Sequence, residues 1–299
     1  MHSVLLFDSQ DYRNATTSHM HNVLGFDHVE PATFRDTIHD ALQNRYATNT
    51  VVRKKVVEAH KIPYVGPGTR FEVIDHDGAR YRGSKLVLAT GIRDVLPSIE
   101  GYRENWGGLI FHCLFCHGYE ERGTGRAGLL VAESSQLLAQ PPIALLLGKM
   151  ARRFADEVTL FTHGNKEVEV ALREAGAEAQ GFAVEPRTIQ RLERVHPPNH
   201  PQDGVSLDVG FLMHMPNTIV TNNWVDQLGL ELEPPGQYKQ KDATMETTVP
   251  GVFVAGDHAS VAKDIPNAAS NATYVASSIA LQLTMEENDA HEAEKSNHI

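Results

Sequence analysis

The chain has 299 residues, 41% of them hydrophobic and 22% charged, which is the composition of an ordinary globular protein with one large or two medium domains. Its formal net charge of -11 at pH 7 argues against nucleic acid and anionic membrane surfaces as standing partners, because both bind clustered cations. No apolar run approaches the ~20 residues that span a bilayer, so we expect a small-molecule or protein partner and no membrane.

The first element expected is a strand over residues 3–7, a short apolar run that ends at Asp8 and is typical of a buried parallel strand. The residues at this end lack the cationic start and cleavage site of a secretory signal, which predicts a cytoplasmic location. A helix is expected over residues 31–46, because apolar residues recur there at helical spacing.

Strands are expected next over residues 51–58, 71–75 and 81–88, and the last two are joined by a hairpin turn at Asp77-Gly78. The last strand stops on the small residues Ala89-Thr90-Gly91. Small residues let the backbone approach a ligand closely, so this strand end is a candidate cofactor contact.

The only two cysteines, Cys113 and Cys116, form one C-x-x-C between His112 and His117. A zinc site needs four ligands, so zinc would have to recruit both histidines and a distant third one. A plain pair of buried thiols is another alternative. In the cytosol such a pair is more often catalytic than structural, and we expect a redox-active disulfide and no metal site.

A strand over 127–132, a helix over 143–154 and a strand over 157–162 predict a βαβ unit, which we interpret as a second nucleotide-binding-like domain inserted into the first. Residues 132–142, between the first strand and the helix, contain no glycine. The backbone there is therefore not expected to approach a pyrophosphate closely, and we expect NADPH binding to be lost. Residues 194–204 are expected to form a loop.

The last part of the chain begins with a turn and a buried strand that ends on Asp257. A helix rich in small residues is expected over 267–283. Residues 286–299 are polar and charged, and we expect a solvated, poorly ordered tail.

In this order, Ala89-Thr90-Gly91, the C-x-x-C, the inserted unit and residues 251–257 resemble low-molecular-weight thioredoxin reductases, which are class-II pyridine nucleotide-disulfide oxidoreductases. Within that superfamily, the sequence of residues 5–9, 12–14, 21–25 and 113–120 resembles that of the fungal gliotoxin-type dithiol oxidases. These are FAD enzymes that close disulfides in small secondary metabolites.

The resemblance implies an α/β fold and a homodimer. It predicts a three-layer FAD-binding domain over 1–119 and 213–285, split by a smaller nucleotide-binding-like insert over 120–212 and followed by the tail over 286–299. It also implies that Cys113 is the outer, exchanging sulfur and Cys116 the flavin-facing one. His117 first, and His112 second, are candidates to accept a proton or stabilise a thiolate.

The resemblance also predicts the residues that contact FAD. An acid that ends the second strand of a dinucleotide fold can bind ribose hydroxyls, which supports the assignment of Asp8 independently. The predicted cofactor-binding residues are Asp8, Ser9, Arg13, Asn14, His21, Asn22, Ala89, Thr90, Gly91, Asp257, Ile265, Asn267 and Ala268.

If Asp8 is the ribose acid, the G-x-G-x-x-G loop for the FAD pyrophosphate would lie ~20 residues earlier, before the first residue of the chain. We therefore expect the N-terminal strand and glycine loop of the fold to be missing. Their neighbours would then lack a ladder partner, and one face of the core would be uncovered.

The function expected is oxidation of a small-molecule dithiol through Cys113 and Cys116 to FAD and on to oxygen. One alternative is an NADPH-dependent thioredoxin reductase-like enzyme, and another is a flavin-free scaffold or partner subunit. Leu114 and Phe115 are expected to be packing residues. Trp106 and Tyr119 either line a hydrophobic substrate pocket or belong to the core.

Overall fold

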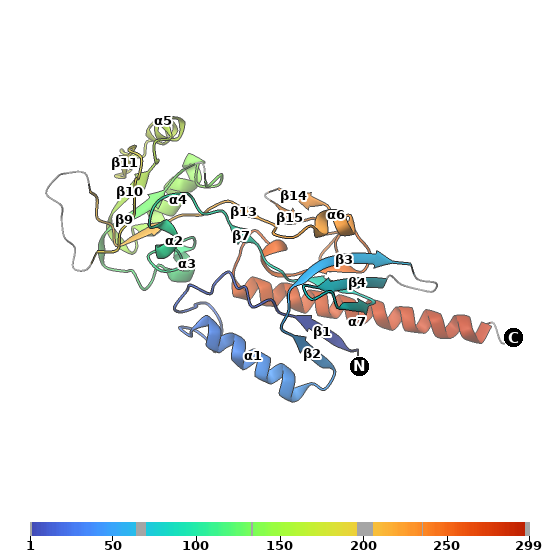
Figure 1. Cartoon of the computed structure of the whole chain (residues 1–299). Coiled ribbons are helices and arrows are strands. Elements are labelled where there is room, and N and C mark those ends of the chain that lie inside the picture. Colours follow the sequence, from blue (N-terminus) through green and yellow to red (C-terminus); the bar gives the residue numbers. More distant parts are fainter. Residues whose placement is uncertain (1, 64–69, 133, 196–205, 235, 297–299) are drawn as a thin grey trace. The chain divides into compact units, whose positions relative to one another are not determined.

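The computed structural model describes residues 2–63, 70–132, 134–195, 206–234 and 236–296 (Figure 1). The chain divides into two compact units: unit 1 is Met1–Arg13, Ala32–Arg93 and Ile219–Ile299, and unit 2 is Asn14–Pro31 and Asp94–Thr218. The predicted domain ranges 1–119, 120–212 and 213–285 have different ends and stay predictions.

Unit 2 is built on a five-stranded parallel sheet with the order β11-β10-β9-β12-β8. The predicted βαβ unit is confirmed as β9, α4 and β10, and Leu129 and Leu160 on its two strands are fully buried. The elements of this unit are α2 (Tyr102–Asn105), β8 (Ile110–Phe111), α3 (Leu114–His117), β9 (Thr124–Leu130), α4 (Pro141–Ala151), β10 (Ala155–Phe161), α5 (Lys166–Glu174), β11 (Ala183–Glu185) and β12 (Phe211–Met213).

Unit 1 contains a three-stranded antiparallel sheet, β3-β4-β5, and a parallel pair, β6 and β16. The predicted hairpin is confirmed between β4 and β5, where Gly78 takes φ 85°. Further elements are β2 (Asn49–Val52), β3 (Val56–Ile62), β4 (Arg70–Asp75), β5 (Arg80–Gly83), β6 (Leu86–Leu88), α6 (Trp224–Leu228), β14 (Leu232–Glu233), β15 (Gln237–Tyr238), β16 (Val252–Val254) and the 3-10 helix η1 (Gly256–His258).

The first strand, β1 (Val4–Phe7), is a parallel strand as predicted and pairs with β2, but the expectation that it is buried is wrong. Val4, Leu5 and Leu6 are 53%, 40% and 39% exposed. The physical reason is that β2 is the one described strand that pairs with β1. The predicted absence of an N-terminal strand and glycine loop stays a prediction.

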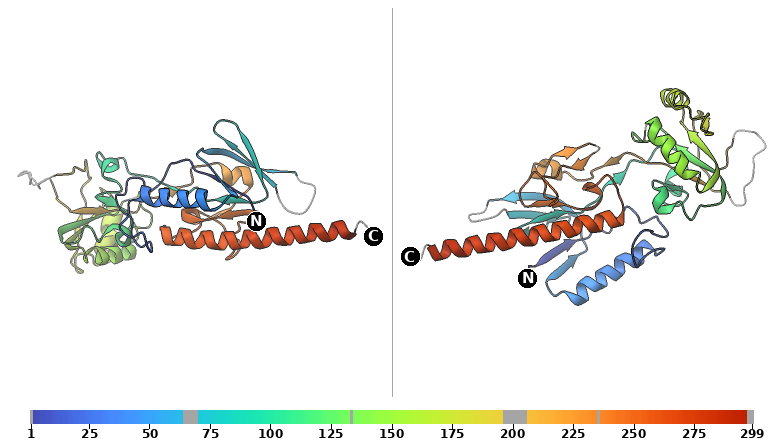
Figure 2. Two further views of the ribbon diagram at one scale, coloured as in Figure 1. Left: turned by 90° about the horizontal axis from the view of Figure 1, so that it is seen from below. Right: turned by 180° about the vertical axis from the view of Figure 1, so that it is seen from behind.

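Two helices of unit 1 were predicted. Helix α1 (Pro31–Arg45) is confirmed, while α7 (Ile265–Ser296) is longer than expected (Figure 2). The expectation of a poorly ordered tail over 286–299 is wrong for residues 286–296, which continue the helix. Ala, Glu and Lys, which favour helices, are frequent there, and Glu286 accepts a 2.5 Å hydrogen bond from Lys85.

The short strands β7 (Arg93–Asp94) and β13 (Thr218–Ile219) lie where the chain passes from one unit to the other. The predicted loop over 194–204 lies largely outside the described residues. None of the described helices has the length and apolar character needed to cross a membrane.

Candidate active site

A disulfide joins Cys113 and Cys116 in unit 2. Both residues are half-buried, so the bond is neither sealed in the core nor fully exposed. The pairing agrees with the expected redox-active disulfide and not with two buried free thiols or a zinc-bound pair. A disulfide exchanges with external thiols only when one sulfur can be reached, and partial exposure meets this condition.

Helix α3 sets the geometry of the pair because Cys113 is its N-cap. The backbone N–H of Cys116 donates a hydrogen bond of 3.0 Å to Sγ of Cys113. Leu114 is buried as expected, at 3% exposure, and anchors the short helix in the core. The same expectation for Phe115 is wrong, since its ring is 74% exposed.

His117 follows the second cysteine directly and is half-buried, with its ring centroid 4.7 Å from that of Phe111. Burial lowers the pKa of His117, while the Glu120 carboxylate acts in the opposite direction. A lowered pKa keeps the imidazole neutral, and a neutral imidazole can accept a proton from a thiol.

A cavity of about 540 Å³ lies beside His117 in unit 2. Burial raises the pKa of Glu121, which also lines it. The cavity is mixed in character, with two cations, two acids and an indole. Its lining includes Arg103, Glu104, Trp106, His117, Glu121 and Arg194.

Trp106 and Tyr119 were expected either to line a substrate pocket or to belong to the core, and the structure distinguishes the two. Trp106 lines the cavity, and its ring centroid lies 6.1 Å from that of His112. Tyr119 is 63% exposed and stacks under the guanidinium of Arg122, so it is neither a lining residue nor a core residue.

In unit 1 the structure brings two predicted cofactor segments to one edge. β6 and β16 pair in parallel from Leu86↔Val252 to Leu88↔Val254, so Ala89-Thr90-Gly91 and Asp257 follow neighbouring strand ends. Gly91 and Gly256 take φ 64° and 82°, conformations that glycine adopts without a Cβ penalty. Ala89 and Thr90 are exposed, which fits close approach by a cofactor.

The N-terminal end of α7 packs against η1 at this edge, so Ile265, Asn267 and Ala268 join the same group. Asp257 receives a 2.9 Å ion pair from Arg13, and both side chains are less than one fifth exposed. The amide of Asn267 is held by the Asp264 carboxylate at 2.7 Å.

Asp8 lies directly after β1, also in unit 1. Its carboxylate accepts hydrogen bonds from the Tyr12 hydroxyl at 2.6 Å and from the Gln10 N–H at 2.8 Å, with His39 Nε2 at 3.4 Å. An acid at this position fits ribose hydroxyls. Ser9 is exposed beside it and accepts from the Asp11 N–H.

The remaining predicted cofactor residues, Asn14, His21 and Asn22, fall in unit 2. Asn22 donates from Nδ2 to the carbonyl of Phe115, within α3, at 3.3 Å. His21 faces Glu120, with 2.9 Å between Nε2 and Oε1. These three residues therefore belong to the same compact unit as the cysteines, whereas Asp8 and Asp257 belong to unit 1.

Sequence reasoning missed two titratable residues that lie at these sites, His258 and Glu120. His258 is fully buried in unit 1, 3.4 Å from the Thr90 hydroxyl, and burial lowers its pKa to about 4. Glu120 closes a cluster with two histidines. No sequence signal identifies His258, whereas the density of histidines over residues 19–28 could have drawn attention to the second group.

The first turn of α4 offers few free donors. Pro141 and Pro142 have no backbone N–H, and the N–H groups of Ile143 and Ala144 both point to the Gln140 carbonyl. A helix that binds a dinucleotide pyrophosphate needs free N–H groups at this end. The geometry therefore agrees with the glycine-free sequence before it.

Comparison with known proteins identifies fungal relatives. The chain is 36% identical over 288 residues to "Thioredoxin reductase sirT" of Leptosphaeria maculans, covering 94% of this chain and 87% of the relative. It is 34% identical over 290 residues to "Thioredoxin reductase aclD" of Aspergillus oryzae, covering 95% and 90%. The predicted resemblance to thioredoxin reductases is confirmed.

Solved structures and a family model agree with these relatives. "Crystal structure of HlmI" matches with TM-score 0.84 at 26% identity, covering 99% of this chain and 89% of that one. An oxidoreductase from Agrobacterium tumefaciens matches with TM-score 0.78 at 30% identity, covering 94% and 90%. The model for "Pyridine nucleotide-disulphide oxidoreductase" matches residues 4–276. The chain is therefore an α/β oxidoreductase that belongs to the pyridine nucleotide-disulphide oxidoreductase family, a family of FAD-binding flavoproteins.

Proposed function

We propose that this enzyme oxidises a small-molecule dithiol to a disulfide, with FAD as its cofactor and oxygen as the final electron acceptor. The observation that carries the proposal is the half-buried Cys113–Cys116 disulfide, followed directly by His117, whose side chain lines a cavity of about 540 Å³. A cavity of this size suits a small molecule better than a protein surface.

The exchange takes place in two displacements. A substrate thiolate attacks Sγ of Cys113, the bond between the two enzyme sulfurs breaks, and Cys116 leaves as a thiolate. The second substrate thiolate then attacks the substrate sulfur of the mixed disulfide, and Cys113 leaves. The substrate loses two electrons and two protons, and the enzyme gains the electrons as a dithiol.

Two groups of this chain assist these steps. His117, kept neutral by burial, accepts the proton of the attacking thiol. The Cys116 N–H that donates to Sγ of Cys113 stabilises the negative charge on that sulfur when it leaves in the second displacement. The assignment of Cys113 as the exchanging sulfur follows the resemblance and is supported by this hydrogen bond.

Bound FAD would supply an acceptor for the two electrons of the enzyme dithiol and a route for them to oxygen. Asp8 would hold the ribose hydroxyls. The remaining contacts would come from the strand ends, the start of α7 and the segment after β1, namely Ser9, Arg13, Asn14, His21, Asn22, Ala89, Thr90, Gly91, Asp257, Ile265, Asn267 and Ala268.

The lining of the cavity bears on the substrate. Arg103 and Arg194 supply cations, and Trp106 supplies a flat apolar surface. Because Glu104 and Glu121 line the same cavity, an uncharged small molecule with carbonyl groups beside an apolar ring fits it better than an anion. The proposed substrate is therefore a polar dithiol metabolite.

NADPH as electron donor is the alternative. The prolines at the start of α4 and the glycine-free approach to it support the oxidase, because both remove backbone donors from a pyrophosphate site. Lys166, the first residue of α5, is paired with Glu169 at 2.8 Å and so is partly neutralised as a phosphate ligand.

Oxygen uptake tests the proposal. Purified enzyme given a small dithiol and no NADPH should consume oxygen, and Cys113→Ser should abolish the uptake while the bound flavin stays. A monothiol at the same thiol concentration is the control, since it cannot close an intramolecular disulfide. Uptake that appears only after NADPH is added would support the reductase instead.

We also propose a cytoplasmic homodimer, which the resemblance implies. Light scattering of the purified protein should give twice the 33.0 kDa of one chain. Imaging of a fluorescent fusion should show a signal throughout the cytoplasm, and a signal confined to an organelle would contradict the location.

A further inference from the structure

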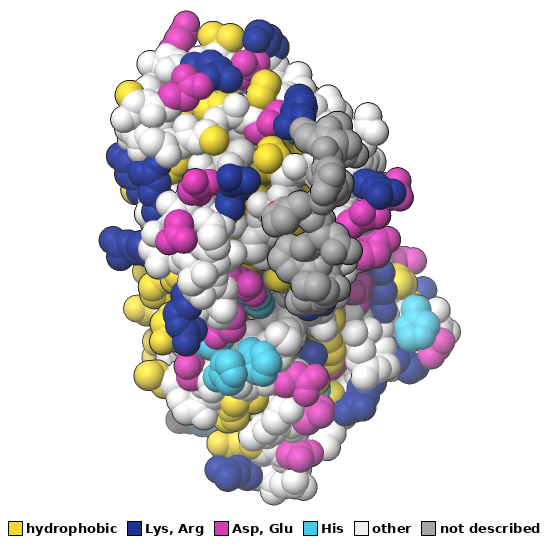
Figure 3. Space-filling model, turned by 90° about the vertical axis from the view of Figure 1, so that its left-hand side faces the viewer, with side chains coloured by type: hydrophobic (Ala, Val, Ile, Leu, Met, Phe, Trp, Pro, Cys, Tyr) yellow, Lys and Arg dark blue, Asp and Glu magenta, His cyan; other side chains and the backbone are white. Residues whose placement is uncertain are grey.

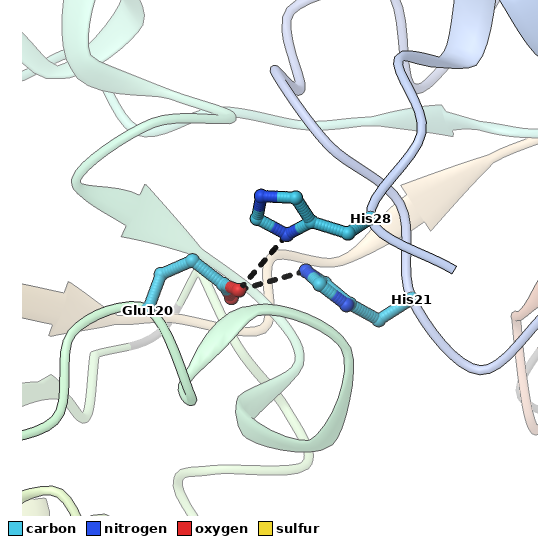
Figure 4. Close-up of side chains that lie close together, drawn as sticks. All are labelled: His21, His28 and Glu120. Atoms are coloured by element: carbon cyan, nitrogen blue, oxygen red, sulfur yellow. Dashed lines mark ion pairs between the residues drawn. The ribbon is translucent and has the colours of Figure 1, made fainter. Parts of the chain in front are cut away.

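A closed loop in unit 2 holds two histidines beside one glutamate. Met20 and Val29 form an antiparallel bridge, and the His28 N–H donates to the Met20 carbonyl at 2.9 Å, so the loop returns on itself. His21 and His28 stand at its two ends and both face Glu120, which follows α3 (Figure 4).

The facing atoms of this group need a proton or a metal ion between them. Nε2 of His21 lies 2.9 Å, and Nδ1 of His28 3.6 Å, from the same oxygen, Oε1 of Glu120. The other oxygen, Oε2, is buried and has no hydrogen-bond partner among the described residues. Lone pairs of two neutral imidazoles and a carboxylate repel one another, so protons or a metal ion must lie between them.

The distances match a metal ion. The three ligand atoms lie within 4.8 Å of one another. A tetrahedral Zn²⁺ with bonds of about 2.0 to 2.1 Å separates its ligand atoms by roughly 3.3 Å, which falls between the two measured separations. Two imidazoles and one carboxylate leave a fourth position for water, and His28, 60% exposed, leaves a path from solvent.

A second carboxylate orients the first histidine. Nδ1 of His21 lies 3.4 Å from Oδ1 of Asp27, and that oxygen also accepts the Asn22 N–H at 3.0 Å. A proton held on Nδ1 leaves the lone pair on Nε2, the atom that faces Glu120. Metal-binding histidines in proteins are commonly fixed this way.

The backbone of the loop is shaped to present these side chains. Asn22 and His28 both take positive φ, 65° and 59°, which is uncommon for residues other than glycine. The ring of His28 stacks on that of His19 with centroids 4.3 Å apart, which limits its rotation. Histidine side chains reach the surface next to acidic ones in the space-filling view (Figure 3).

We propose that His21, His28 and Glu120 bind one Zn²⁺ ion, with Asp27 as the positioning residue for His21. No metal site was predicted from the sequence, and these ligands come from two segments that only the fold brings together. The ion would fix the loop over Met20–Val29 to the segment that follows α3. This inference does not depend on the proposed dithiol oxidation, and it assigns His21 to the metal ion in place of FAD.

Zinc titration of the protein with its disulfide closed tests the site, since closed cysteines cannot supply thiolate ligands. Calorimetry should show one Zn²⁺ per chain, and the Tm should rise by about 3 °C with zinc in excess. Glu120→Gln and His28→Ala should each weaken binding at least tenfold, and Asp27→Asn should weaken it by about 10 to 100-fold. His28 is exposed, so its variant keeps the fold.

Glu58→Gln is the matched control, because Glu58 and His60 form an exposed pair at 2.9 Å without a second histidine. It should bind zinc like the wild type. Cobalt replacing zinc should give the visible absorption of a four-coordinate ion. An absence of saturable zinc binding would overturn the proposal, because protons alone would then lie between the side chains. Zinc binding that Glu120→Gln leaves unchanged would overturn it as well.

Discussion

The backbone N–H of Cys116 donates a 3.0 Å hydrogen bond to Sγ of Cys113, so the sulfur of the first cysteine has a hydrogen-bond donor within the C-x-x-C. Within this C-x-x-C the two sulfurs are therefore not equivalent. The same hydrogen bond should favour negative charge on Cys113 once the disulfide is reduced, because a thiolate accepts more strongly than a thiol.

Alkylation rates should report this difference between the sulfurs. The Cys116→Ser variant retains the backbone N–H donor and leaves Cys113 as its one thiol. At neutral pH this thiol should react with iodoacetamide about tenfold faster than the Cys116 thiol of the Cys113→Ser variant. The reason is that one hydrogen bond to a charged group is worth about 1.5 kcal/mol. Mass spectrometry of timed samples measures both rates. Equal rates, or a faster Cys116, would reverse the assignment of the exchanging sulfur.

The pH dependence of substrate oxidation should reflect His117. Burial lowers its pKa below 6.5, so the ring stays neutral as pH falls through 6.5 and the rate should decline only at lower pH. The Glu120 carboxylate raises the pKa of His117, and the imidazoles of His21 and His19 lower it further. The other charged residues that line the cavity beside His117 are Arg103, Glu104, Glu121 and Arg194.

His117→Gln should lower the rate about 100-fold and remove the acidic limb of the profile. Stopped-flow measurement of thiol exchange from pH 5 to 8 provides the data. A variant with an unchanged profile would show that another group accepts the proton.

The ion pair between Arg13 and Asp257 should support flavin binding. The two side chains are 18% and 19% exposed, so Asp257→Asn removes the negative charge from a largely buried ion pair. We expect a clear loss of bound flavin and a Tm lower by a few degrees. Glu231→Gln breaks an exposed pair with Lys239 at 2.7 Å and should change neither the flavin content nor the Tm.

Gly101 should be irreplaceable at the start of α2, the helix that supplies Arg103 and Glu104 to the cavity. It takes φ 75°, and a Cβ there would lie 1.9 Å from the Leu192 carbonyl oxygen. Gly101→Ala should cost about 2 to 5 kcal/mol from backbone strain plus the clash.

Gly123→Ala is the control for that substitution. Gly123 has a similar φ of 84° but open space around a Cβ, so only the strain of about 1 to 2 kcal/mol remains. Denaturant unfolding of both variants gives the comparison. Equal losses of stability would mean that the close approach of Leu192 is not maintained in solution.

Acid should destabilise unit 1 through His258. Its pKa is lowered to about 4 by burial, so the unfolded state binds the proton first as pH falls below 6.5. Stability from the neutral ring is present above 6.5 and is lost progressively down to about pH 4. Between pH 7.5 and 5 this amounts to about 2 kcal/mol, and His258→Asn should remove that part of the pH dependence. A variant whose unfolding free energy still falls by the full wild-type amount would contradict this assignment.

Much of the fold followed from local pattern. The apolar runs before Ala89-Thr90-Gly91 and before Asp257 predicted β6 and β16, because buried parallel strands have a distinctive composition. Only the structure shows that these two strands pair and share an edge. The two cysteines predicted the redox disulfide, because no other cysteine could complete a metal site.

Other features depend on tertiary context that a single sequence does not contain. Val4 to Leu6 have the composition of a buried strand, and only the absence of a second described ladder partner explains their exposure. Phe115 is apolar yet exposed, because α3 has a single turn and buries Leu114 instead. The meeting of His21 and His28 with Glu120 requires two distant segments to fold together.

Anaerobic reduction of the flavin by a dithiol tests the central claim most directly. Purified protein should be yellow, and a small dithiol added without NADPH should bleach the flavin absorbance in the wild type. Cys113→Ser and Cys116→Ser should keep the flavin and its colour but resist bleaching. A colourless folded protein, or bleaching that persists in both serine variants, would contradict electron transfer through the Cys113–Cys116 pair.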